Sequence, residues 1–103
     1  MNQYLYILRA TRPELTVSGP TEEEMPALGA HAAYLERLSG EGVMIAAGRT
    51  LRNHVSDFGL AVFQAESDAA AEEIMRNDPA IVHGVMTAEL FPYRIAFGTV
   101  LRA

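Results

Sequence analysis

The chain has 103 residues and a formal charge of −5, which suits one domain over residues 1–103 and argues against nucleic-acid partners, because these require a clustered basic surface. Cysteine and lysine are both absent, which excludes disulfides, thiol nucleophiles, cysteine-bound metals and lysine Schiff bases. The start MNQYLYILRA does not resemble a signal peptide, and no apolar stretch reaches the roughly 20 residues of a membrane span, so we expect a cytoplasmic protein without a membrane partner.

The first half of the sequence predicts a strand and then a helix. Residues 3–11 contain the apolar run YLYIL, which is typical of a strand, and a loop with two prolines follows. Thr21 and Glu24 have the spacing of a capping box, which predicts the start of a helix. A proline just beyond the box delays regular helix to about the residue after Glu24. The helix should end at Gly40 or Gly42, since glycine is typical of helix ends.

The second half adds strands around a second helix. Ser67 to about Asn77 predicts this helix, and Asp78 followed by proline predicts a short helical turn with aspartate as its cap. Gly59 indicates a bulge or a close approach of another backbone at the start of its strand. Apolar runs predict strands at residues 43–48, 58–65 and 85–93, and residues 95–101 are a candidate tail strand.

The order of these elements predicts an α+β, ferredoxin-like βαββαβ fold with an antiparallel sheet. Right-handed crossovers place both helices on one face of that sheet. The strands are nevertheless apolar on both sides: Tyr4 and Tyr6 face one way, and Leu5 and Ile7 face the other. A sheet with one solvated face should carry polar residues at alternate positions. We therefore predict that a second copy of the chain covers the other face, giving a homodimer.

His31 is the first candidate for chemistry. At 100° per residue, His31 shares an arc of about 80° with Leu28, Leu35 and Leu38, so it points toward the sheet. It can be a core-edge histidine bonded to a backbone carbonyl. Alternatively, it can be a neutral imidazole in a pocket that takes and returns a proton near pH 7. A carboxylate that fixes its tautomer would favour the second interpretation.

Asp78 is the best candidate for that carboxylate. It follows Ile74 by four residues and so leaves its helix on the side that faces the sheet. Both helices start from the same edge of the predicted fold, and the axial mismatch between His31 and Asp78 is a few ångströms, up to roughly 8 Å. An aspartate before a proline is also a common helix cap, and the two roles can coexist.

The other polar residues support fewer hypotheses. Arg9 and Arg49 end the first two strands and either bind an anionic group or remain solvated. Three histidines without ligand spacing do not predict a metal site, and the serines lie in loops or caps, which does not support a serine triad.

Three segments of the chain resemble the YCII-related family: HAAYLERLSGEGVMIAAG (31–48), FGLAVFQAES (58–67) and NDPAIVHGVMTAELFPY (77–93). The resemblance implies a ferredoxin-like fold that dimerises as an α/β barrel, and a His–Asp active site that here would be His31 and Asp78. One branch of the family performs dehydrochlorination in the breakdown of chlorinated aromatics, and muconolactone isomerases share the wider fold. Some relatives have proline in place of Arg49 and serine in place of Gly59, so no substrate is carried over.

These observations leave two hypotheses. In the first, the chain is a cofactor-independent acid–base enzyme that eliminates from or isomerises a small polar or aromatic molecule. His31 would move the proton, Asp78 would orient the imidazole, and Arg9 or Arg49 would hold an anionic group. In the second, the chain is a non-catalytic dimer that binds a small ligand or supports an assembly, since a fold does not define a function.

Overall fold

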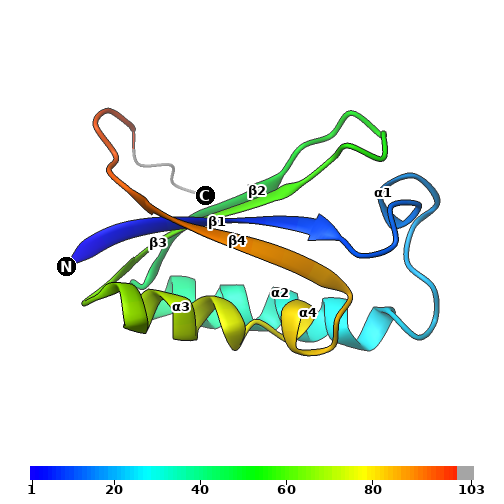
Figure 1. Cartoon of the computed structure of the whole chain (residues 1–103), viewed down its shortest axis with the longest axis horizontal. Coiled ribbons are helices and arrows are strands. Elements are labelled where there is room, and N and C mark those ends of the chain that lie inside the picture. Colours follow the sequence, from blue (N-terminus) through cyan, green and yellow to red (C-terminus); the bar gives the residue numbers. More distant parts are fainter. Residues whose placement is uncertain (100–103) are drawn as a thin grey trace.

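The computed structural model describes residues 1–99 and has the predicted βαββαβ order with two short helices added. The four strands form one antiparallel sheet in the order β2-β3-β1-β4, and helices α2, α3 and α4 lie on one side of it (Figure 1). The strands are β1 (Asn2–Ala10), β2 (Met44–Arg49), β3 (Gly59–Ala65) and β4 (Met86–Tyr93), and the helices are α1 (Leu15–Ser18), α2 (Met25–Gly40), α3 (Asp68–Arg76) and α4 (Pro79–Val82).

The core lies between the sheet and the helices. Alternate residues of β1 face the helices, and Tyr4, Tyr6 and Leu8 are all buried there. Phe63 of β3 packs against both tyrosines, with ring centroids 5.9 Å from Tyr4 and 5.6 Å from Tyr6. Leu38 of α2 closes the same cluster. Three aromatic rings at the centre of the sheet therefore hold the two crossover helices in place.

The predicted caps form, and they set where the helices begin. Thr21 and Glu24 make the reciprocal bonds of a capping box, with Glu24 Oε1 accepting from the Thr21 amide at 2.8 Å and Thr21 Oγ1 accepting from the Glu24 amide at 3.3 Å. Regular helix then begins at Met25, as the proline required. At the start of α3, the Ser67 side chain accepts from the amide of Ala70. No helix within residues 1–99 is long and apolar enough to cross a membrane.

Two details differ from the sequence-based predictions, and one open alternative is decided. The loop after β1 contains the short helix α1, which the patterning did not indicate. Of the two alternatives for Gly59, the structure has the close approach: a Cβ added there would lie 3.3 Å from Leu8 Cδ1 and 3.6 Å from the Gly48 carbonyl oxygen. The irregular register lies in β2, between Met44 and Ala46. Residues 95–99 of the candidate tail strand are not in a strand, since the Ile95 amide donates to the Gln3 side chain; residues 100 and 101 lie outside the described chain.

The face of the sheet opposite the helices is covered by no helix of the described chain (Figure 1). Leu5, Ile7 and Val62 are half-buried on this face, because neighbouring side chains cover part of each from solvent. Phe91 and Tyr93 of β4 lie on the same face and are 36% and 46% exposed. This apolar face is unusual for a solvated sheet, in which polar residues alternate with apolar ones.

Candidate active site

His31 and Asp78 meet between α2 and the segment that joins α3 to α4. His31 Nδ1 lies 2.7 Å from Asp78 Oδ1 and 2.9 Å from Oδ2. The His31 side chain is 16% exposed and the Asp78 side chain is fully buried. The two residues are 47 apart in the sequence, so the tertiary fold alone creates this contact.

Asp78 is held by its backbone as well as by its partners. It is the N-cap of α4, and its Oδ1 accepts from the amide of Ala80 at 3.0 Å. The following Pro79 disfavours helical backbone at Asp78, whose extended conformation separates α3 from α4. The predicted cap and the predicted contact with His31 thus coexist in one carboxylate. Because the side chain is buried, these bonds replace the hydration that it has lost.

Tyr6 is the third member of this cluster, and the sequence pattern around it did not predict this role. Its hydroxyl donates to Asp78 Oδ2 at 2.9 Å, from the centre of β1. Burial, followed by the negative charge of Asp78, raises the pKa of Tyr6, so the phenol keeps its proton and stays a donor. The available signal was the placement of Tyr6 on the inner side of a central strand, where a buried hydroxyl requires a partner.

The arrangement determines which nitrogen of His31 is free to react. An ionised carboxylate only accepts hydrogen bonds, so the Nδ1 that faces Asp78 carries the proton. In the neutral ring, Nε2 then has the lone pair and is available to accept a proton. Nε2 has no hydrogen-bond partner within residues 1–99. The cluster can therefore present one base, oriented by Asp78, which in turn accepts from Tyr6.

A cavity of about 760 Å³ adjoins His31. Helix α2 forms one wall, the β2–β3 hairpin forms a second and the segment after β1 forms a third. Leu8, Leu28 and Leu35 make much of the surface apolar, whereas Asp78 lies behind His31 and does not line the cavity. This size and mixed lining are typical of pockets for small organic molecules.

Arg49 lines the cavity because of the irregularity in β2. Met44 pairs with Phe63, but Ala46 pairs with Val62, so Ile45 is the extra residue of a bulge. The bulge reverses the alternation that follows it and brings Arg49 opposite Gly59, on the helix side of the sheet. Without the extra residue, Arg49 would face the other side.

Arg9 lies elsewhere. Alternation along β1 places it on the face opposite Tyr6, where its guanidinium carbon lies 5.1 Å from the centre of the Phe58 ring. It does not line the cavity, so the structure brings only Arg49, of the two candidate arginines, together with His31. Arg49 is exposed and forms no ion pair within residues 1–99.

The loop between β2 and β3 is more ordered than its polar sequence indicated. Asp57 is buried and accepts from the Thr50 hydroxyl at 2.7 Å and from the amides of Arg52 at 3.0 Å and His54 at 3.1 Å. These bonds, led by that from Thr50, lower the pKa of Asp57 to about 2. The carboxylate thus binds backbone amides of its own loop and stabilises the loop conformation. This loop forms part of the cavity wall.

The remaining histidines do not join the site. His54 and His83 are exposed, in the β2–β3 loop and at the end of α4. In the part of the chain that the structure describes, no group of three or more His, Cys, Asp or Glu side chains is placed to hold a metal ion.

Comparison with known proteins identifies the family. The family model described as the YCII-related domain matches residues 4–93. A solved structure of 5-chloro-2-hydroxyhydroquinone dehydrochlorinase (TftG) from Burkholderia phenoliruptrix AC1100, in complex with 2,5-dihydroxybenzoquinone, is 22% identical with a TM-score of 0.62, covering 88% of this chain and 93% of that one. SnoaB, a cofactor-independent oxygenase from Streptomyces nogalater, is 15% identical with a TM-score of 0.50, covering 95% of this chain and 97% of that one.

These comparisons confirm the α+β fold class, because both solved structures share the fold of this chain over most of its length. At these low sequence identities, the structural similarity supports a shared fold and does not support a shared activity. No curated protein matches the chain. The family match covers most of the sequence and includes all three segments on which the resemblance rested, residues 31–48, 58–67 and 77–93. The chain therefore belongs to the YCII-related family.

Proposed function

We propose that this protein is a small-molecule enzyme in which His31 acts as a general acid–base and Asp78 orients it. The observation that supports this most directly is the bond of His31 Nδ1 to the buried Asp78, beside a cavity that His31 lines. A histidine that only filled the core would not need a fully buried carboxylate together with an open cavity. Asp78 holds the ring, Tyr6 donates to Asp78, and Nε2 exchanges the proton.

The substrate that fits this cavity is small, largely apolar and anionic at one end. Apolar side chains such as Leu28 and Leu35 suit a planar ring. The guanidinium of Arg49, which forms no ion pair within residues 1–99, suits a carboxylate or a phenolate. The complex of the dehydrochlorinase with 2,5-dihydroxybenzoquinone supports the same class of molecule. In an isomerisation, the proton that His31 removes from one atom returns to another. In an elimination, the proton is removed as an anion departs.

A second copy of the chain covers the apolar face of the sheet in this proposal. Leu5, Ile7 and Val62 lie at the centre of that face, with the exposed Phe91 at one side. Exposed apolar surface of this kind favours association. Ile7→Glu would place a charge in the interface and should convert the dimer into a monomer, as measured by sedimentation velocity. A wild-type protein that sediments as a monomer contradicts this part of the proposal.

The catalytic proposal is tested by matched histidine variants. Turnover is screened on hydroxylated and chlorinated aromatic acids and hydroquinones, and the rates of His31→Asn and His83→Asn are compared with wild type. Loss of a general base should lower kcat by about 10²- to 10⁴-fold in His31→Asn. His83 is exposed and does not line the cavity, so His83→Asn should retain the wild-type rate.

A folded His31→Asn protein with undiminished turnover contradicts the role of His31. Ligand binding without turnover, at a wild-type cavity, would instead favour the non-catalytic binding protein.

A further inference from the structure

The third wall of the cavity is a short segment that has little packing of its own. Residues 13–20, which include α1, connect β1 to α2, and five of them line the cavity. We call this segment the β1–α2 wall. Within it, Leu15 is buried against Ala27 and Val85, whereas Val17 is 48% exposed. One buried side chain is a weak anchor for a segment of this length, so its position depends on polar contacts.

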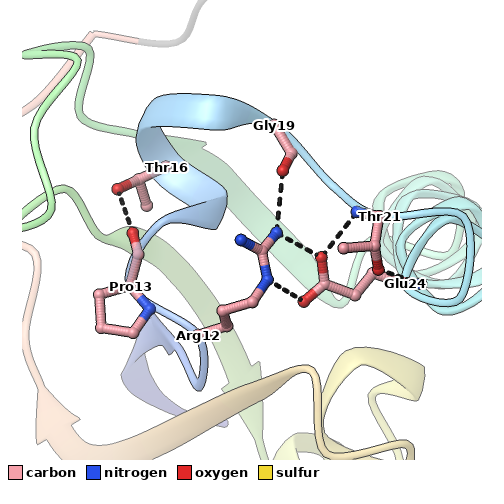
Figure 2. Close-up of polar contacts among 6 residues, drawn as sticks. All are labelled: Arg12, Pro13, Thr16, Gly19, Thr21 and Glu24. Atoms are coloured by element: carbon pink, nitrogen blue, oxygen red, sulfur yellow. Dashed lines mark hydrogen bonds and ion pairs between the residues drawn. The ribbon is translucent and has the colours of Figure 1, made fainter.

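Arg12 supplies those contacts at the base of the wall. Its Nη2 donates to Glu24 Oε1 at 2.7 Å and to the carbonyl of Gly19 at 2.9 Å, and its Nε donates to Glu24 Oε2 at 3.2 Å (Figure 2). Arg12 precedes the wall and Gly19 lies near its end, so the guanidinium connects the two ends of the segment. The planar fork of arginine is suited to holding a carboxylate and a carbonyl at once.

The same carboxylate also fixes the start of the helix that carries His31. Glu24 Oε1 accepts from the Thr21 amide in the capping box at the start of α2 (Figure 2). The hydrogen bond from Arg12 is the main cause that lowers the pKa of Glu24 to about 2, so the pair is charged at neutral pH. Arg12 thus joins the wall to the helix on which His31 lies.

Midway along its length, the wall has a contact that can exchange. Thr16 Oγ1 lies 2.8 Å from the carbonyl of His54 in the β2–β3 loop and 2.9 Å from the carbonyl of Pro13 in its own segment. A hydroxyl has one proton and donates it to one of these acceptors at a time. The wall is therefore firmly held at its base, by charged groups, and loosely held where it meets the opposite loop.

We propose that Arg12 is a positioning residue of the cavity, which holds the β1–α2 wall against α2 and so limits the size of the ligand that reaches His31. This rests on the proposed function, in that the ligand is the molecule on which His31 acts. Arg12 does not line the cavity and acts through Gly19 and Glu24. Loss of its contacts should loosen the wall without altering the His31–Asp78 cluster.

The test compares Arg12→Gln with Arg76→Gln, which removes an exposed Arg76–Glu72 ion pair of the same 2.7 Å length. Hydrogen exchange is followed at the amides of Ser18 and Gly19, which bond within the wall. Affinities are measured for 2,5-dihydroxybenzoquinone and for the larger 2-hydroxy-1,4-naphthoquinone. In Arg12→Gln the two amides should exchange about tenfold faster, and the affinity ratio should shift about threefold or more toward the larger quinone. Arg12→Lys, which keeps the charge without the fork, should be intermediate.

Arg12→Gln that matches Arg76→Gln in both exchange and affinity ratio overturns the proposal. If Arg12→Gln does not fold, Arg12→Lys decides by the same two measurements. A wild-type protein that binds neither quinone counts against the proposed function, whereas the exchange at Ser18 and Gly19 still determines whether Arg12 holds the wall. Global destabilisation would raise exchange in β1 and β4 as well, and a change confined to the wall distinguishes the positioning role.

Discussion

The site contains two buried carboxylates, Asp78 and Asp57, and each accepts hydrogen bonds from several donors. They differ mainly in how far from the carboxylate those donors lie in the sequence. Asp78 is fully buried and joins β1, α2 and α4 through Tyr6, His31 and Ala80. Asp57 is buried in its own loop, and its donors Thr50, Arg52 and His54 lie within seven positions of it in the sequence. The first connects distant elements and the second organises one loop. The difference teaches that equal numbers of hydrogen bonds need not have equal importance for the fold.

Removal of Asp78 should have the largest effect. Asp78→Ala leaves Tyr6 and His31 without their acceptor in a buried place and removes the cap of α4. We expect the free energy of unfolding to fall by about 3–5 kcal/mol. Urea denaturation measures this loss, with Asp78→Asn as the control because the amide oxygen can still cap the helix. A loss below about 1 kcal/mol would mean that Asp78 is no more important than a surface acid.

A comparison of two tyrosines on β1 should have an intermediate effect. Tyr6 donates to the buried Asp78, whereas Tyr4 donates to Asp68 in a part-buried contact of 2.7 Å. Tyr6→Phe should lower the free energy of unfolding by about 1.5 kcal/mol and Tyr4→Phe by about 0.5 kcal/mol, because water can replace the phenol at Asp68 more readily. Equal losses in thermal or urea denaturation would remove the distinction between buried and peripheral donors on this strand.

The pH dependence of Asp57 should have the smallest effect. Its pKa is lowered from 3.8 to about 2 in the folded protein, so the unfolded chain takes up a proton first as the pH falls. The stability that Asp57 provides is therefore present above about pH 4 and is lost as the pH falls toward 2. Asp57→Asn should be less stable than wild type at pH 6, and the difference should shrink at pH 2.5. A difference that stays constant over this range contradicts the lowered pKa.

Much of the architecture was accessible from the sequence because it depends on local patterns. The βαββαβ order follows from apolar runs, and the capping box at Thr21 and Glu24 follows from side-chain spacing. The inward direction of His31 follows from the period of the helix, and Asp78 as a cap follows from the proline after it. Each of these inferences needs only residues within a few positions of one another.

The features that define the cavity required the tertiary structure. Tyr6 reaches Asp78 across 72 positions of sequence, and the bulge at Ile45 that turns Arg49 toward the cavity depends on how β2 pairs with β3. Arg12 holds Gly19 and Glu24 only because the chain folds back after β1. Sequence determines the direction of a side chain from its own helix or strand. The choice of partner depends on register and on crossing between elements, which are set by packing over the whole core.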